Sequence, residues 1–565
     1  MYDVAEFFSG IGSQAKALHN LGLYGKTSVT CEWDVHAIIA YDLIHNSNEI
    51  PDDILNMSKE QLLEFLGQYT FSNSGKDPLK YNALRTYSLE TLQRLCLSIR
   101  RNHNSVDINK LSGRDMPDSI DILTYSFPCQ DLSNVGALHG YRRGIDRDSG
   151  SRSSLLWQVG RILHEMQVAG KKLPRFLLME NVPTLLSKRH FPNFTIWIDG
   201  LERLGYLSQY YCLNASSFGL PQNRPRLLMI SVLVGNDVEQ AELVRNYFQE
   251  KNTPAAVVND YMKSKFYRKY TVQEFLRTDY DDKQLFEEAC ECTPNDTVSR
   301  QKIWDENPQI VRQDYIFNDA VAVIRTITTK QDRNPNSGNL YFESHINGKG
   351  KFRYLTPREC LLFMGFTDAD YQALKDNNLE FHKGDALFAR DKVIRMAGNS
   401  IPVKLLEGMF YQIWQIDQFL SDFRRLRGSE RSRRKLKESR IKQIKSFLFS
   451  AGIRCRKSVR DYPEDADLLY PKYNTAIFVC DCFEHGYKCK ETAIPEINHR
   501  LWKEMFRTTN SRSEDAHKRA LKLGWHVIVV WDCAIKKADK MQALLTAIKA
   551  NAGHTLIPDE VMEIV

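Results

Sequence analysis

The stretch that decides the fold is Ser126-Phe127-Pro128-Cys129-Gln130-Asp131-Leu132-Ser133. It follows the apolar run 120–125, which predicts a buried strand of a parallel sheet. Pro128 fixes its own φ and stiffens the loop that carries the thiol of Cys129. Open α/β sheets bind their ligands beyond the carboxyl ends of such strands, so this thiol stands where a site is expected. The alternative is a cysteine that only packs, because free cysteine is often buried.

A nucleotide-type site is predicted at the start of the chain. Strand-like residues 4–8 run into Ser9-Gly10-Ile11-Gly12-Ser13, and helical spacing follows over 14–21. Glycines in such a turn let the backbone approach a ligand, and the helix N-terminus favours negative groups. About 20 residues further on, Glu32 ends a second strand, where a carboxylate can bind both ribose hydroxyls. Trp33 beside it can stack on a purine; a solvated loop carboxylate is the alternative for Glu32.

The α/β pattern then continues with one interruption. Residues 46–104 predict a mostly helical insertion, and 105–108 a third strand whose Asp107 can accept from an amine of the ligand. Later strands are predicted at 176–179, ending in Glu180, and at 227–234.

The totals limit the function classes. A chain of 565 residues predicts two or three domains. It contains no apolar run of 18 residues and no basic leader, so we expect a cytoplasmic protein without a membrane span. Twelve cysteines in such a chain indicate reduced thiols, and a net charge of +7 permits a nucleic-acid partner.

Six blocks in one order resemble those of DNA cytosine-5 methyltransferases, over residues 1–415. The blocks are Phe8-Ser9-Gly10-Ile11-Gly12, Phe127-Pro128-Cys129-Gln130, Glu180-Asn181-Val182, Gln222-x-Arg224-x-Arg226, Thr356-Pro357-Arg358-Glu359 and Gly398-Asn399-Ser400. The resemblance implies a Rossmann-like, S-adenosylmethionine-dependent catalytic domain over 1–233 and 352–415, with a target recognition domain at 234–351. Gln158 departs from the family, which often has glutamate there.

The family resemblance implies roles for the residues of these blocks. Cys129 is expected to attack carbon 6 of a cytosine flipped out of the duplex, because carbon 5 alone is a poor nucleophile. Glu180 is expected to protonate or hydrogen-bond ring nitrogen 3 and to bind the amino group. Arg224 and Arg226 are expected to favour the thiolate and to hold the flipped nucleotide and its phosphate.

The resemblance also assigns the S-adenosylmethionine site. Phe8 and Trp33 are expected to flank the adenine, Glu32 to hold the ribose, Asp107 the adenine amine, and Asn399 the polar end, over the turn formed by Gly10 and Gly12.

Double-stranded DNA is the expected partner, bound by a monomer. Residues 263–270 interleave basic and aromatic side chains, as a DNA-binding surface does. The alternative for this stretch is a solvated amphipathic face. Residues 324–334 resemble the Thr-aliphatic element of the recognition domain, so Thr326 and Ile327 are expected to contact DNA, as is Arg358.

A second module is predicted after the catalytic domain. Residues 416–440 contain a basic run, which predicts a linker that also touches phosphate. Residues 430–537 then resemble a very-short-patch-repair (Vsr-type) mismatch endonuclease, which implies a restriction-endonuclease-like α/β domain at 441–565. Such enzymes nick beside T·G pairs, which arise when 5-methylcytosine deaminates. The matching residues, in order, are Asp467, Cys482, His485, Cys489 and Cys533.

This second resemblance is incomplete. Expected family residues are replaced by Cys480 (a histidine), Glu484 (a tryptophan wedge), Tyr487 (a zinc-ligand histidine) and Ile441 (a glutamate). Cys482, Cys489 and Cys533, with Cys480 as a fourth ligand, are expected to bind Zn²⁺. Asp467 and Asp481 are expected to hold Mg²⁺ beside His485. A T·G-nicking enzyme and a zinc-stapled DNA-binding module remain alternatives.

The predicted function is thus a bacterial or phage DNA cytosine-5 methyltransferase of the restriction–modification or orphan type, associated with the nucleoid. Two alternatives remain at this point: a DNA-binding scaffold or regulator with a degenerate core and an inactive tail, and a transfer RNA methyltransferase of the same fold.

Overall fold

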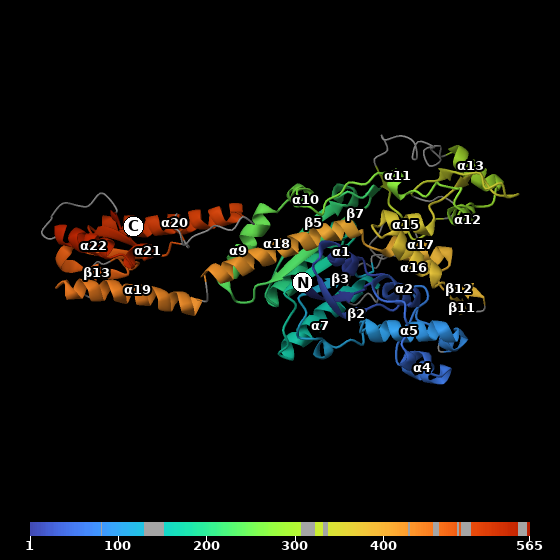
Figure 1. Cartoon of the computed structure of the whole chain (residues 1–565), viewed down its shortest axis with the longest axis horizontal. Coiled ribbons are helices and arrows are strands. Elements are labelled where there is room, and N and C mark those ends of the chain that lie inside the picture. Colours follow the sequence, from blue (N-terminus) through green and yellow to red (C-terminus); the bar gives the residue numbers. More distant parts are fainter. Residues whose placement is uncertain are drawn as a thin grey trace. The chain divides into compact units, whose positions relative to one another are not determined.

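The computed structural model describes residues 1–80, 82–128, 152–306, 323–331, 337–382, 384–427, 430–455, 463–482, 485–486, 499–551 and 562–564. The chain divides into two compact units, Met1–Ile413 and Trp414–Val565 (Figure 1). Residues 234–351, which were expected to form a separate domain, lie in the same unit as the catalytic blocks. No helix within the described residues is long and apolar enough to cross a membrane.

A six-stranded sheet forms the centre of the first unit. Its strands, in spatial order, are β2 (Tyr24–Cys31), β1 (Tyr2–Phe7), β3 (Ile122–Tyr125), β4 (Phe176–Asn181), β7 (Pro225–Leu233) and β5 (Tyr206–Asn214). β1 to β4 are mutually parallel, and β7 runs antiparallel to both of its neighbours. β1 lies between β2 and β3, so chain connections leave it in both directions. Ligands bind at such a switch point, beyond the strands' carboxyl ends.

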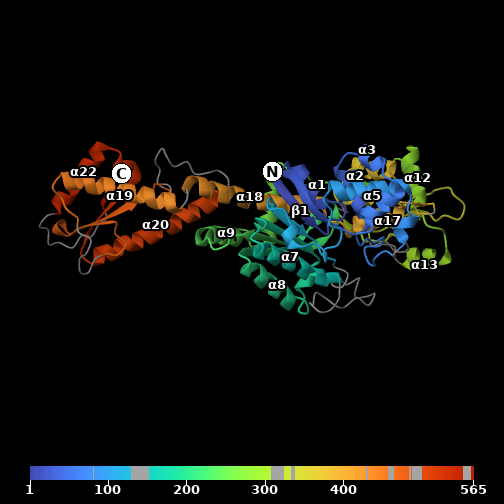
Figure 2. The same ribbon diagram turned by 90° about the horizontal axis from the view of Figure 1, so that it is seen from below.

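One face of this sheet is covered by α7 (Leu156–Val168) and α8 (Phe191–Arg203), which Figure 2 shows together on one side. Their apolar residues, among them Val159, Ile162 and Trp197, pack with Phe7 and Leu123 of the strands in one buried cluster. Strands that are apolar on both faces need helices on each face, which explains their nearly continuous hydrophobic runs.

The predicted insertion is mostly helical. It follows α2 (Val35–His45) and contains α3 (Asp52–Leu55), α4 (Lys59–Leu66) and α5 (Leu89–Arg101). The prediction of a strand at 105–108 is wrong. Only an isolated bridge joins Thr30 to Asn104, and the chain turns immediately afterwards. Val106 has φ near +60°, a conformation that no strand adopts and that a β-branched residue rarely tolerates.

The rest of the first unit is built from short elements. Residues 234–351 carry α9 (Val238–Glu250), α10 (Pro254–Met262), α11 (Val272–Phe275), α12 (Lys283–Glu291) and α13 (Val298–Glu306), with β8 (Ile324–Arg325) and β9 (Leu340–Tyr341). β8 pairs in parallel with β6 (Gln222–Asn223), whereas β9 pairs antiparallel with β10 (Phe352–Arg353). The unit closes with α15 (Pro357–Phe363), α16 (Asp368–Asp376), the hairpin β11–β12 (Glu380–His382 and Asp385–Ala386) and α17 (Arg390–Asn399).

The prediction of a linker at 416–440 is also wrong for most of its length. α18 (Val403–Arg427) runs past Ile413 into the second unit, and α19 (Glu430–Ser450) begins three residues after it ends. Apolar residues of α18 explain why the helix continues: Phe419 and Phe423 pack against the fully buried Trp502 of α20 (His499–Lys522). The basic residues around 430 therefore belong to helices.

A four-stranded sheet organises the second unit, in the order β13 (Leu468–Tyr470), β14 (Thr475–Cys480), β15 (His526–Trp531) and β16 (Met562–Ile564). α19 and α22 (Ala538–Ala550) pack on one face, and α20 packs on the other (Figure 2). β14 alternates accordingly: Ile477 and Val479 enter the first cluster, while Phe478 and Cys480 enter the second. A short helix, α21 (Asp532–Ile535), follows β15.

Candidate active site

The carboxyl ends of β1, β2, β3 and β4 open onto a cavity of roughly 410 Å³. Nine residues singled out in the sequence line it: Phe8, Gly10, Glu32, Trp33, Asp107, Glu180, Arg224, Arg226 and Asn399. Phe127 and Pro128 line it as well, so the chain enters the Pro-Cys turn from the cavity wall. Cys129 itself lies outside the described residues.

The turn after β1 shapes one wall of this cavity. Phe8 has φ near +58°, and its N–H donates to the carbonyl of Cys31, 2.7 Å away. A non-glycine residue in the left-handed region is strained and persists where its surroundings fix it. Gly12, with φ near +80°, does not line the cavity. A Cβ at Gly12 would lie 2.2 Å from Nε2 of His45, so this glycine serves close packing.

Glu32 is held by backbone amides at the end of β2. Its Oε2 accepts from the N–H of Gly10 at 3.0 Å, and its Oε1 accepts from those of Trp33 and Asp34 at 2.9 Å each. Burial raises the pKa of this carboxyl to about 7, and the three backbone donors oppose the rise. The side chain therefore fixes the turn after β1 to the residue expected to stack on a purine.

Glu180 and Arg226 form a close ion pair at the cavity. Nε of Arg226 lies 2.9 Å from Oε1 of Glu180, and the two side chains are 13% and 12% exposed. Burial raises the pKa of Glu180, while the charges of Arg226 and Arg224 lower it. The next residue, Asn181, donates from its amide to the carbonyl of Phe127 at 2.9 Å. That bond ties the end of β4 to the residue before Pro128. Asn181 was named only as part of a block, because nothing in the sequence showed its partner.

Arg224 differs from its expected role. Its guanidinium donates to the carbonyls of Ile327 at 2.7 Å, Gly398 at 2.7 Å and Ser400 at 2.9 Å, and the residue is 1% exposed. A guanidinium that is hydrogen-bonded to three carbonyls is not available to bind a phosphate. Arg224 instead joins β7 to the Gly-Asn-Ser block, and its charge acts on Glu180 from within the wall.

The residues expected to contact DNA are also placed differently. Ile327 is fully buried, and its N–H donates to Oε1 of Gln222 at 3.0 Å. The hydroxyl of Thr326, which is half-buried, donates to the carbonyl of Asn223 at 2.6 Å. The side chain of Arg358 is 7% exposed, and its guanidinium pairs with Glu288 and Asp368. Arg358 is therefore a structural ion-pair residue here, because its charge is already balanced inside the fold.

In the second unit, three expected residues lie near the carboxyl end of β14. Asp467 accepts from the N–H of Val479 at 2.7 Å and pairs with Lys437 of α19 at 2.9 Å. Asp481 pairs with Arg440 at 3.0 Å. The ring of His485 bonds the carbonyl of Asp481 and the hydroxyl of Ser513, each at 2.9 Å.

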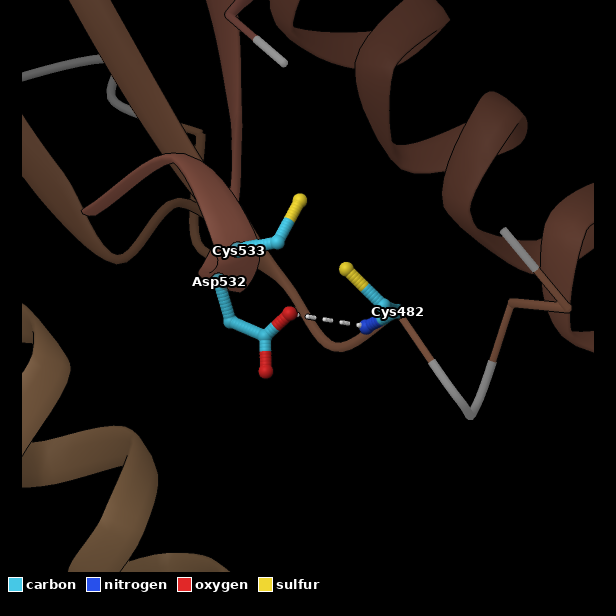
Figure 3. A group of neighbouring side chains, drawn as sticks. All are labelled: Cys482, Asp532 and Cys533. Atoms are coloured by element: carbon cyan, nitrogen blue, oxygen red, sulfur yellow. Dashed lines mark hydrogen bonds between the residues drawn. The ribbon is translucent and has the colours of Figure 1, made fainter. Parts of the chain in front are cut away.

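The expected zinc ligands are partly brought together. Cys482, Asp532 and Cys533 place one ligand atom each within 4.8 Å of one another. Figure 3 shows the three side chains side by side. Burial, followed by the effect of Asp532, raises the pKa of the Cys482 thiol, so its thiolate form needs a cation nearby. Cys480 does not join this group. Cys480 lies in the apolar cluster under α20. The residue that lies beside Cys482 and Cys533 is Asp532. Cys489 lies outside the described residues.

Comparison with known proteins decides the family. Residues 80–415 match the family model for C-5 cytosine-specific DNA methylases. The chain belongs to this family. It is 30% identical over 419 residues to the orphan methyltransferase M.SssI of Spiroplasma monobiae, covering 73% of this chain and 96% of that protein. It is 28% identical over 420 residues to the type II methyltransferase M2.ScrFI of Lactococcus lactis subsp. cremoris, covering 74% and 99%.

The tail of this cytosine-5 methyltransferase matches a second family. Residues 427–491 match the model described as DNA mismatch endonuclease Vsr. The type II nicking enzyme V.NmeAIP of Neisseria meningitidis is 32% identical over 110 residues, which cover 19% of this chain and 79% of that enzyme. The two resemblances inferred from the motifs are both confirmed.

As a DNA cytosine-5 methyltransferase, the enzyme uses S-adenosylmethionine, and the cavity fits that cofactor. Gly10 has φ near +55°, and a Cβ there would meet no atom within 4 Å, so its backbone borders open space. The cavity has an aromatic side chain in Trp33 and a carboxylate in Glu32, which suit an adenosine group. The sequence did not reveal that Arg395 and Gly75, the latter from the insertion, also line this cavity.

Proposed function

We propose that this methyltransferase modifies cytosine at carbon 5 within one specific duplex sequence, through a covalent adduct with Cys129 on a flipped-out base. The observation that carries the proposal is the Glu180–Arg226 pair in the cavity wall, with Asn181 holding the chain two residues before Cys129. This arrangement brings an acid, a cation and the two residues that precede Cys129 to one cavity.

The chemistry follows from the residue types. The thiolate of Cys129 forms a bond to carbon 6 of cytosine, which makes carbon 5 electron-rich, and the charge that moves to ring nitrogen 3 is met by Glu180. A carboxyl whose pKa is raised by burial is suited to donate a proton there. When bound, S-adenosylmethionine supplies the electrophilic methyl group. Loss of the carbon 5 proton to a base then expels Cys129.

The residues of the cavity divide between cofactor and base. We assign Phe8, Trp33, Glu32, Asp107 and Asn399 to the cofactor and Glu180 with Arg226 to the cytosine. A cytosine inside a duplex cannot reach this enclosed space, so the base must leave the helix.

The direct test is to incubate the enzyme with unmethylated genomic DNA and S-adenosylmethionine, then to map 5-methylcytosine by bisulfite sequencing. Methylation at one short motif is expected, and Cys129→Ser should abolish it. Unchanged turnover of Cys129→Ser would refute the covalent mechanism. Methyl transfer to transfer RNA but not to duplex DNA would instead favour an RNA substrate, and cofactor binding without transfer to either would favour a scaffold.

For the second unit we propose a DNA-binding role at or near the same motif. Deamination of 5-methylcytosine leaves a T·G pair, so a mismatch-endonuclease-like unit attached to a cytosine-5 methyltransferase has a coherent substrate. Cys482 and Cys533, with Cys489, would hold a structural Zn²⁺ beside Asp532. Metal analysis of the purified full chain tests this: one zinc per chain is expected, and its loss in Cys533→Ser.

A further inference from the structure

Two basic side chains of α19 form ion pairs with the carboxylates of the endonuclease-like centre. Nζ of Lys437 lies 2.9 Å from Oδ1 of Asp467, whose Oδ2 accepts from the N–H of Val479 at 2.7 Å. Both oxygens of the aspartate at the family's metal position therefore have partners. The Asp467 side chain is only 12% exposed, so its charge needs a nearby compensating group.

Arg440 lies one turn further along α19 and joins the other two carboxylates. It pairs with Asp481 at 3.0 Å and, through its second terminal nitrogen, with Asp532. Asp532 also accepts from the N–H of Cys482 at 3.2 Å, the bond drawn in Figure 3. One guanidinium thus connects the end of β14 to the start of α21.

The donor set does not fit Mg²⁺. A hard divalent cation needs oxygen ligands that converge on one point. Mg²⁺ is commonly held by one or two protein carboxylates together with water or phosphate oxygens, so those carboxylates must be available to it. Here each of the two expected magnesium aspartates pairs with a cation of α19 instead, Asp467 with Lys437 and Asp481 with Arg440.

The sequence of α19 explains why cations lie beside these carboxylates. Ile441, which stands where the related endonucleases carry a glutamate, packs against the apolar cluster beneath α19. Lys437 precedes it by four residues and so lies on the same side of the helix. At this helix face the chain has an apolar residue and a cation, where a metal site would use a carboxylate.

We propose that this unit has replaced its divalent-metal site with the Lys437–Arg440 pair, so that it binds DNA without Mg²⁺ and does not cleave it. The inference rests on the DNA-binding role proposed above. Three carboxylates without a cation would repel a phosphate, whereas two fixed cations remove most of that charge. A DNA backbone can then approach without a bridging metal.

Metal binding directly tests whether the Lys437–Arg440 pair has replaced a divalent metal ion. Bound Mn²⁺ is counted on the full chain, loaded with zinc, for the wild type and for Asp467→Asn. Equal counts are expected. Lys437→Gln should gain one ion, which the Lys437→Gln/Asp467→Asn double variant should lose again. Lys442→Gln, at an exposed position of the same helix, should gain none. A wild-type ion that depends on Asp467, or no gain in Lys437→Gln, would overturn the proposal.

Cleavage is measured on the T·G form of the methylated motif, with methylation of the normal motif assayed in parallel. We expect no nick with Mg²⁺ present and a DNA affinity that EDTA does not change. Mg²⁺-dependent nicking that is lost in Asp467→Ala would overturn the inference while leaving the methyltransferase intact. If removal of the exposed positive charges of α19 leaves the DNA affinity unchanged, that result would instead contradict the DNA-binding role.

Discussion

Nε of Arg226 lies 2.9 Å from Oε1 of Glu180 in a wall where both side chains are nearly buried. Burial raises the pKa of Glu180, and the two arginines lower it. In Arg226→Gln that pKa should rise further, because one positive charge is removed. If the protonated acid is the working form, the rate falls as pH rises through this pKa, so the falling limb of the kcat profile should move to higher pH.

Glu180→Gln provides the control for this pH profile. It removes the titrating group, so the limb should disappear and kcat should fall about 10²- to 10⁴-fold, the usual contribution of a general acid. An unchanged limb in Arg226→Gln would show that Glu180 is not the group observed.

Affinity for S-adenosylmethionine should depend on pH through Glu32. Burial raises the pKa of this carboxyl to about 7, and the carboxylate is the form that accepts hydrogen bonds from ribose hydroxyls. The carboxylate is present above that pH and is lost below it. The Kd should therefore rise by up to about tenfold per pH unit below 7, the limit for one proton. Calorimetric titration of the enzyme without DNA measures it, and Glu32→Gln should bind weakly at every pH.

Arg224→Lys should lower stability more than its conserved charge suggests. A lysine cannot reach the carbonyls of Ile327, Gly398 and Ser400 together, so at least one buried charge-assisted bond is lost. The cost is about 2–4 kcal/mol, visible as a lower midpoint of denaturant unfolding. Arg268→Lys, at an exposed arginine that pairs with Glu274, should change the midpoint little. Equal midpoints for the two variants would contradict a structural role for Arg224.

The sequence predicts the strands and the cofactor turn well because local patterns specify them. Apolar runs set β1, β3, β4 and β7, and the Gly-x-Gly turn needs left-handed glycines at fixed positions. The place of an acidic residue about 20 residues after that turn identifies Glu32, and one family block identifies Glu180; both border the cavity.

Contacts between distant segments are where the prediction fails. Arg224 and Arg358 carry the charges expected for DNA binding, but Arg224 bonds Ser400, 176 residues away along the chain, and Arg358 pairs with Glu288, 70 residues away. The same holds for Lys437, whose partner Asp467 belongs to the next strand region. A pattern of charges does not say which of them the fold will neutralise, because that depends on tertiary packing.

The insertion should matter for the cofactor through Arg395 of α17. Its guanidinium donates to Oδ2 of Asp34 at 2.7 Å and to the carbonyl of Asn73 at 3.0 Å. The backbone of Ser72 is in turn bonded to Trp33 and Val35, and Gly75 lines the cavity. Arg395 therefore holds a loop of the insertion against the residue assigned to stack on adenine.

Arg395→Ala should raise the KM for S-adenosylmethionine roughly tenfold, about 1.4 kcal/mol, with a smaller change in kcat, because the Trp33 wall loses its support while the catalytic residues do not move. Arg395→Lys should recover part of the loss by keeping the pair with Asp34. Asp391→Asn, at an exposed position of the same helix, is the matched control and should leave KM unchanged. Steady-state methylation at saturating DNA measures both constants. A fall in kcat at constant KM would mean that the loop acts on the chemical step and not on cofactor binding.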